Sequence, residues 1–215
     1  MKLFNWIINL FKTKESPKTE APSKPNQSET PSSSNSSTTS NSSKKLKIAI
    51  VRGHGGKDGG ASGCGTTEVE YNTWVMKEIE KLNLPNVKCF YGSSSVNAVL
   101  QTIPWNPDLT IQLHQNAYNG VAKGCCVLVL DGDTKSYPYA EAFAKAFTEK
   151  FNRAMRNPNE KGKVRLKSSD RGYTSLKTTV FGAKILVEPF FIDNKNDFVS
   201  REEYAEFLIE FIKGL

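Results

Sequence analysis

The stretch LKIAIVRGHGGKDGGA (residues 46–61) joins an apolar run to a loop crowded with glycines. The run is mostly aliphatic or β-branched, which is typical of a buried strand. The glycines permit positive φ and let a ligand approach the backbone closely. His54, one of only two histidines in the chain, lies in this loop, where it can serve as an accessible metal ligand. A phosphate cradle is the alternative, but the loop lacks the spacing of a P-loop, and no GxGxxG motif leads into a helix.

The second histidine, His114, has the same context. It ends another apolar run, Asp108–His114, and Gln115, Asn116 and Ala117 follow it in a loop. In open α/β sheets, ligands gather at the carboxyl ends of the strands. The two histidines are therefore candidates to converge in space.

Hydrophobic periodicity predicts strands that alternate with helices. Strands are expected over residues 46–51, 87–91, 108–114, 124–130 and 184–192, and helices over residues 67–82, 95–103 and 138–155 and after residue 200. This alternation predicts an α/β fold, a mixed, mostly parallel twisted sheet with helices on both faces. The strand that carries Cys125 and Cys126 is a candidate antiparallel neighbour, and these two side chains must point to opposite faces of the sheet.

Two glutamates remain without an evident structural role. Thr67 and Glu70 match the capping box at the start of a helix, which leaves Glu68, in the first turn, free. Ser200 and Glu203 form a second capping box at the terminal helix. Glu188 interrupts the last apolar strand, and a lone carboxylate there is costly to bury unless it is paired, protonated or close to a metal.

These residues match the needs of a catalytic zinc site. Such a site takes three protein ligands from imidazole nitrogens and carboxylate oxygens and keeps a fourth position for water. His54, Glu68 and His114 supply that set. Glu188 is the candidate for the group that takes and returns the proton of the attacking water. Their spacing fits no short zinc motif such as HExxH, so the residues alone indicate a mononuclear zinc hydrolase and no more.

The first 45 residues differ in composition from the rest of the chain. Residues 1–12, MKLFNWIINLFK, form a short amphipathic or apolar segment that is too short to span a bilayer as a helix. It is expected to be an interfacial anchor, with a poor export signal and a segment docking on its own domain or a partner as alternatives. Residues 13–45 are rich in Ser, Thr and Pro and predict a disordered linker. The folded domain is then expected over residues 46–215.

Charge and cysteine content narrow the class of partner. The net charge is +7, but residues 1–45 hold seven Lys and three Glu, so the remaining 22 basic and 19 acidic residues leave the domain at only +3. Nucleic acid is therefore not an expected partner. The four cysteines show no CxxC spacing and are expected to be mostly reduced apolar fillers. The basic segment between Arg153 and Arg171 is expected to be a solvated loop, with contact to an anionic wall polymer as the alternative.

Four motifs, in order, resemble those of one enzyme family. They are Gly-His-Gly-Gly-x-Asp-x-Gly-Ala within residues 51–61, Glu-Val-Glu-Tyr-Asn at 68–72, Asp-Leu at 108–109 with Leu-His-Gln-Asn-Ala at 113–117, and Leu-Val-Glu-Pro-Phe-Phe at 186–191. The chain is in this respect similar to the zinc-dependent N-acetylmuramoyl-L-alanine amidases of the Amidase_3 type, which hydrolyse the bacterial cell wall. The resemblance covers nearly the whole of residues 46–215.

The resemblance implies roles for particular residues. His54, Glu68 and His114 would bind one Zn²⁺ per catalytic domain, Glu188 would be the catalytic glutamate, and Asn116 would help to shape the site. The substrate would be peptidoglycan, cut at the amide between the lactyl group of N-acetylmuramic acid and L-alanine.

The resemblance also implies where the protein acts. It would work at the cell wall, in the periplasm or outside the cell, in wall remodelling or phage-type lysis. Peripheral membrane or wall contact through residues 1–12 is expected separately, from the apolar composition of that segment. A non-catalytic peptidoglycan-binding module and a zinc hydrolase for another amide are the alternatives.

The chain departs from the family pattern in three places. Val51 and Arg52 replace the usual Asp-Pro before the first Gly-His. The stretch between the second and third strands lacks the usual arginine, which predicts a shortened helix. Glu70 stands where aspartate is common, so Glu70 is an alternative to Glu68 as the metal ligand.

Overall fold

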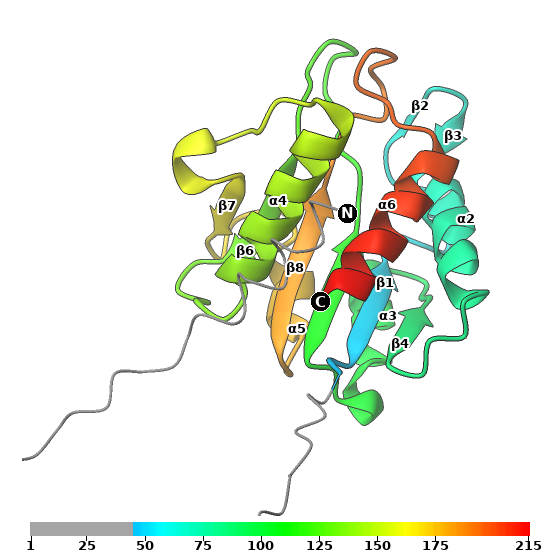
Figure 1. The fold of residues 1–215 in the computed structure, drawn as a ribbon, viewed down its shortest axis with the longest axis vertical. Coiled ribbons are helices and arrows are strands. Elements are labelled where there is room, and N and C mark those ends of the chain that lie inside the picture. The colour runs from blue at the N-terminus through cyan, green and yellow to red at the C-terminus, as the bar shows by residue number, and fades with distance from the viewer. Residues whose placement is uncertain (1–44) are drawn as a thin grey trace, which may run out of the picture.

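Six strands form one twisted sheet in the computed structural model, which describes residues 45–215 (Figure 1). In spatial order they are β4 (Val87–Phe90), β1 (Ile48–Arg52), β5 (Leu109–Leu113), β8 (Ala183–Glu188), β6 (Cys126–Leu130) and β7 (Lys163–Leu166). All neighbours pair in parallel except β6 and β8, which pair antiparallel. The predicted mixed, mostly parallel sheet is confirmed, and so is the antiparallel placement of the strand that begins at Cys126.

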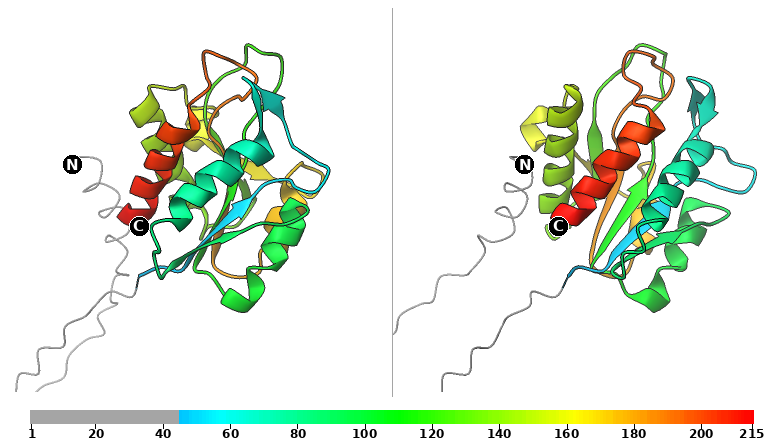
Figure 2. Two further views of the ribbon diagram at one scale, coloured as in Figure 1. Left: turned by 90° about the vertical axis from the view of Figure 1, so that its right-hand side faces the viewer. Right: turned by 45° about the vertical axis from the view of Figure 1, so that its right-hand side comes forward.

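Helices cover both faces of this sheet, as predicted. The helices on one face are α2 (Glu68–Glu80), α4 (Tyr137–Phe151) and α6 (Arg201–Gly214), and those on the other are α3 (Ser95–Leu100) and α5 (Tyr173–Thr178). Figure 2 shows α2, α4 and α6 side by side in front of the strands. The remaining elements are the short 3₁₀ turns η1 (Ile103–Trp105) and η2 (Pro158–Glu160) and the hairpin of β2 (Ser62–Gly63) and β3 (Thr66–Thr67).

Alternation along the strands divides the core between the two faces. On β1, Ile48 and Ile50 pack into the large cluster with α2, α4 and α6, whereas Val51 packs with Ala98 and Val99 of α3. On β6, Cys126 joins the smaller cluster under α5, while the preceding residue Cys125 lies in the large one. The opposite orientation expected for the two adjacent cysteines is therefore observed.

Aromatic side chains hold the three helices of the larger face together. Phe147 of α4 meets Phe207 of α6 edge to face, with ring centroids 5.3 Å apart, and Tyr71 of α2 meets Phe190 in the same way at 5.5 Å. Such pairs add specific geometry to the burial of large apolar surfaces. The hydroxyl of Tyr71 also donates to the carbonyl of Val199, 2.9 Å away, which ties α2 to the start of α6.

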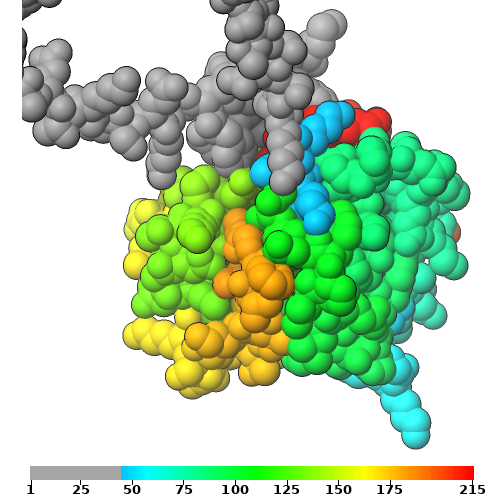
Figure 3. Space-filling model, turned by 90° about the horizontal axis from the view of Figure 1, so that it is seen from below, coloured from blue at the N-terminus to red at the C-terminus, as the bar shows by residue number. Residues whose placement is uncertain are grey.

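At the base of the sheet, segments far apart in the sequence lie side by side (Figure 3). The amide of Ala183 donates to the carbonyl of Asp108 at 2.9 Å, and the amide of Lys184 donates to Ser136 Oγ at 2.8 Å. These contacts join the start of β8 to the segments that precede β5 and α4. They fix where β8 begins relative to β5, and the parallel register of these two strands then sets where each strand ends.

The prediction of a solvated basic loop was wrong. The segment after α4 instead forms η2 and the edge strand β7, and Arg171 leads into α5. Lys163 is buried and pairs with Glu141 of α4, while Arg165 lies 2.7 Å from Glu160. The buried Lys163 is compensated by a carboxylate of α4, while the exposed Arg165 pairs with a carboxylate of its own segment.

Smaller corrections concern the ends of helices and one cysteine. The helix expected over 138–155 ends at Phe151, because Asn152 adopts φ 51° and closes the last turn. Ser200 accepts the expected bond from the amide of Glu203, but the Glu203 carboxylate accepts from the Ser200 hydroxyl, so only half of the capping box forms. All four cysteines of the described chain are free, but Cys64 is exposed and is no core filler.

Two expectations concern residues for which no structure is described. The apolar segment 1–12 and nearly all of the linker 13–45 lie outside the described residues. Within residues 45–215, no helix combines the length and the apolar character needed to cross a bilayer.

Candidate active site

The two histidines meet because their strands are neighbours. β1 and β5 pair in parallel with Arg52 opposite Leu113, and the amide of Gly53 donates to the carbonyl of Leu113 at 3.0 Å. His54 and His114 thus leave the sheet from adjacent strand ends, with their ring centroids 4.9 Å apart. The convergence expected from the sequence is observed.

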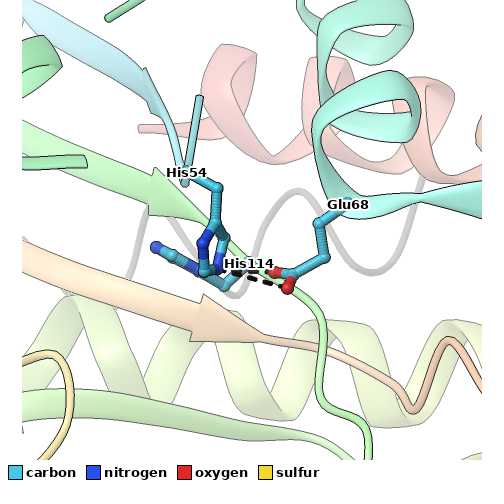
Figure 4. A group of neighbouring side chains, drawn as sticks. All are labelled: His54, Glu68 and His114. Carbon is cyan, nitrogen blue, oxygen red and sulfur yellow. Dashed lines mark ion pairs between the residues drawn. The ribbon is translucent and has the colours of Figure 1, made fainter. Parts of the chain in front are cut away.

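Glu68 reaches the same point from the first turn of α2 (Figure 4). One of its carboxylate oxygens lies 3.3 Å from His54 Nε2 and the other 3.3 Å from His114 Nδ1. The three side chains each offer a ligand atom, and these atoms all lie within 4.8 Å of one another. Glu70 caps α2 instead, accepting from the amide of Thr67 at 3.0 Å in the predicted capping box. Of the two candidate glutamates, Glu68 faces the histidines.

Backbone amides fix the Glu68 carboxylate from both sides. The amide of Ala61 donates to Oε2 at 2.6 Å and the amide of Gln115 donates to Oε1 at 2.8 Å. Gln115 is in turn held by reciprocal amide bonds with Asn72, of 2.8 and 3.1 Å. Only 3% of Glu68 is exposed. The Glu68 carboxylate is therefore preorganised. Sequence reasoning did not identify Asn72 or Gln115 as residues of the site.

Mutual charge stabilisation shows in the acid–base properties of the cluster. Burial opposes ionisation of Glu68, but hydrogen bonds from His114 and His54 outweigh it and hold the pKa of Glu68 below its usual range. The hydrogen bond to Glu68, opposed by burial and helped by Asp58, raises the pKa of His54 to about 9. Glu68 is therefore a buried carboxylate that stays ionised, as a ligand of a cation must.

Asp58 orients His54 and was also missed. Its Oδ2 lies 2.7 Å from His54 Nδ1, and its Oδ1 accepts from the amide of Gly60 at 2.9 Å. His54 itself adopts φ 56°, and its amide donates to Ser95 Oγ at 2.9 Å. With Nδ1 engaged, His54 presents Nε2 to Glu68. The Gly-His-Gly-Gly-x-Asp motif could have predicted this contact, because Asp58 follows His54 by four residues. A metal-binding histidine commonly has a carboxylate hydrogen-bonded to its second ring nitrogen.

The donor set fits a zinc ion. Two imidazole nitrogens and one carboxylate are the ligands that open, catalytic zinc sites use. The Glu68 carboxylate has no Lys or Arg partner among the described residues, and the buried Nε2 of His114 has no hydrogen-bond partner there. A dication held by His54, Glu68 and His114 would compensate this buried charge.

Glu188 lies at the end of β8, opposite Cys126 of the antiparallel neighbour β6. Burial is the main reason that the pKa of Glu188 lies above its usual range. Cys126 Sγ lies 3.6 Å from Glu188 Oε2, and Asn116 Nδ2 lies 3.6 Å from the same sulfur. Asn116 is thus linked to Glu188 only through the sulfur of Cys126, and its predicted part in shaping the site stays a prediction.

A cleft of about 240 Å³ joins these groups. His54, His114 and Glu188 all line it, which places the candidate proton acceptor and the histidine pair on one solvent-filled space. Leu128 and Leu186 contribute apolar side chains to its lining. Walls come from Ser95 and Val96 of α3 and from the segment Arg171–Ser175, which includes the start of α5.

Arg52, which replaces part of the usual lead-in to the first histidine, has a structural role. Its guanidinium donates to Thr73 Oγ1 of α2 at 3.0 Å and to the carbonyl of Gly92 at 2.8 Å. It also lies over the ring of Tyr91, 5.6 Å from the centroid. Arg52 thus fastens the end of β1 to α2 and to the loop after β4, which supports the loop that carries His54.

Comparison with protein families gives a direct result. The model of the Amidase_3 family, described as N-acetylmuramoyl-L-alanine amidase, matches residues 48–206. The chain belongs to this family. It is therefore an enzyme of the amidase class, a hydrolase that acts on peptidoglycan in the cell wall, and the resemblance seen in the sequence is confirmed. No curated protein sequence matches the chain.

Solved structures share the amidase fold. Cwp6 from Clostridium difficile superposes with a TM-score of 0.62 at 24% identity over 79% of this chain and 28% of that one. The catalytic domain of the CD27L endolysin targeting Clostridia difficile gives 0.56 at 23% identity over 78% of this chain and 97% of that one. An N-acetylmuramoyl-L-alanine amidase from Clostridium difficile 630 gives 0.58 at 16% identity over 79% and 92%. This chain spans only about a quarter of Cwp6, and identities this low show the fold alone.

Proposed function

We propose that residues 46–215 form a catalytic domain that hydrolyses the amide between the lactyl group of N-acetylmuramic acid and L-alanine in a zinc-dependent reaction. In this proposal His54, Glu68 and His114 hold the metal and Glu188 moves the proton. The observation that carries it is the convergence of His54, Glu68 and His114, two of which, the histidines, line one cleft together with Glu188. A bound zinc ion would polarise the scissile carbonyl and lower the pKa of the attacking water.

Glu188 has the properties that proton transfer requires. A general acid–base group works best when its pKa lies near the operating pH. Burial moves the pKa of Glu188 in that direction from its ordinary value, while the nearby His114 limits the shift. Glu188 would therefore take a proton from water and return it to the leaving amine of L-alanine.

The other residues of the site act by orientation. Asp58 holds the His54 ring, and the amides of Ala61 and Gln115 hold Glu68. Because these hydrogen bonds already fix His54 and Glu68, little reorganisation would accompany binding or reaction.

The test is digestion of purified peptidoglycan with and without a zinc chelator, followed by identification of the bond that is cut. We expect release of free L-alanine amino termini, loss of activity with the chelator and recovery on addition of zinc. Binding without release would instead favour a non-catalytic module, and a different new terminus would favour another amide as substrate.

Glu188→Gln tests the assignment of the proton-transfer group. Turnover should fall by about 100-fold or more, since general acid–base catalysis contributes that much, while zinc content stays at one per chain. Glu206→Gln on the exposed face of α6 is the charge-matched control and should leave activity unchanged. Full activity of the Glu188 variant would overturn the assignment.

The proposed biological context is cell-wall remodelling or phage-type lysis, with residues 1–12 serving as a peripheral anchor and residues 13–45 as its tether. The apolar composition of the first segment and the Ser, Thr and Pro content of the second support this arrangement. A chain that begins at Leu46 should keep its activity on soluble wall fragments and lose association with membrane vesicles or wall sacculi. Unchanged association would contradict the anchor.

A further inference from the structure

Arg171 lies where it can contact a charged group of a bound substrate. It lies in the wall of the cleft directly before α5, on the same space as His54, His114 and Glu188. It is the only Lys or Arg among the residues that line this cleft. The positive charge of Arg171 is also close enough to Glu188 to act to lower the pKa of that carboxyl group.

The guanidinium of Arg171 has no partner within the described part of the chain. No ion pair, hydrogen bond or ring contact engages it there, and the residue is exposed. Its neighbour Asp170 forms no ion pair with it, and the Asp170 carboxylate instead accepts from the amide of Lys167 at 2.7 Å. Other basic residues of the same segment behave differently: Lys163 pairs with Glu141, and Arg165 with Glu160.

An unpaired arginine in a substrate cleft is suited to an anionic group of the substrate. A guanidinium recognises a carboxylate through two parallel hydrogen bonds, and the pairing is stronger than one between neutral groups. The peptide stem offers such a group close to the scissile bond, because the residue after L-alanine is D-glutamate linked through its side chain, which leaves its α-carboxyl free as a carboxylate or an amide.

We propose that Arg171 binds the free α-carboxylate of this second stem residue and makes the enzyme prefer stems in which that group is not amidated. The proposal rests on the proposed function, since it assumes that L-alanine leaves beside Glu188. Arg171 acts here as a specificity residue that contacts the substrate away from the reacting bond.

The dimensions of the cleft agree with this assignment. Consecutive α-carbons of a peptide lie about 3.8 Å apart, so the second residue of the stem stays within roughly one residue length of the scissile nitrogen. A cleft of about 240 Å³ is smaller than the sites that hold drug-sized ligands and suits a fragment of this size. Glu188 and Arg171 line the same space, so one short stem can contact both.

The test compares two synthetic substrates, muramoyl-L-alanyl-D-isoglutamate and the same compound with isoglutamine, which differ only in the free carboxylate or amide. For Arg171→Gln we expect kcat/KM on the isoglutamate substrate to fall about tenfold, the size of one exposed charge-assisted interaction, mainly through KM. On the isoglutamine substrate the variant should match the unaltered enzyme. Arg171→Lys, which keeps the charge but not the fork of donors, should retain part of the preference.

Lys167→Gln is the matched control, because it removes one positive charge from the same exposed segment without altering a residue that lines the cleft. It should leave kcat/KM on both substrates unchanged. An equal loss on both substrates in Arg171→Gln would overturn the proposal, because Arg171 would then act on the reacting bond itself. No loss on either substrate would also overturn it. Failure of the unaltered enzyme to cleave either compound would contradict the proposed function, and the specificity proposal would fall with it.

Discussion

The contact between Asp58 and His54 predicts how tightly the proposed site would hold a zinc ion. Asp58→Asn replaces the carboxylate that lies 2.7 Å from His54 Nδ1 with a neutral amide of the same size. Loss of such a partner of a metal-binding histidine costs about 10- to 100-fold in metal affinity. The Asp58 side chain is 68% exposed, so solvent weakens the interaction. We therefore expect the low end of that range, about a tenfold loss.

The assay is competition for zinc with a chromophoric chelator at neutral pH, with amidase activity measured at increasing zinc concentration. The variant should need about ten times more free zinc for half-maximal activity and should reach nearly the full rate at saturation, because Asp58 is not on the cleft. Glu206→Gln is the charge-matched control. Unchanged zinc affinity would refute the reasoning, and a loss of saturated rate alone would show that Asp58 acts on the reaction instead.

Three further predictions follow from other contacts. Cys126→Val removes a weak donor that favours ionised Glu188, so the pKa of Glu188 should rise and the acidic limb of the pH–rate profile should move about half a pH unit upward. Gly53→Ala places a Cβ 2.4 Å from His114 Cε1 and 2.6 Å from a backbone carbonyl, so displacement of the ring should cost about 100-fold in activity and weaken zinc binding. Arg52→Met removes two hydrogen bonds of a half-buried guanidinium and should lower the free energy of unfolding in urea by about 1–3 kcal/mol.

Each of these predictions has its own contradicting result. If the acidic limb of the pH–rate profile does not move in Cys126→Val, the Cys126 thiol has no influence on the pKa of Glu188. Normal zinc content and rate in Gly53→Ala would show that His114 tolerates the added carbon. An unchanged free energy of unfolding in Arg52→Met would show that its two hydrogen bonds add nothing to stability, and Arg52→Lys, which keeps the charge, should recover part of any loss.

Much of the site was predictable because its signals are local. His54 and His114 each follow an apolar strand directly, and the parallel pairing of neighbouring strands then brings them to one edge. The Thr67–Glu70 capping box accounts for one of two nearby glutamates and so pointed to Glu68, which lies beside the two histidines in the structure. Such patterns act over a few residues, where backbone geometry and turn chemistry dominate.

What the sequence by itself determined is the alternation of most strands and helices, the α/β class and the group of histidines and glutamates that could serve as ligands. Only the tertiary structure decided what stands around that group. Cys126 reaches Glu188 across 62 residues, Arg52 reaches Gly92 across 40, and Lys163 of β7 pairs with Glu141 of α4 across 22. These contacts leave no periodic trace in the chain, since they depend on which strands become neighbours and on charges brought together by folding.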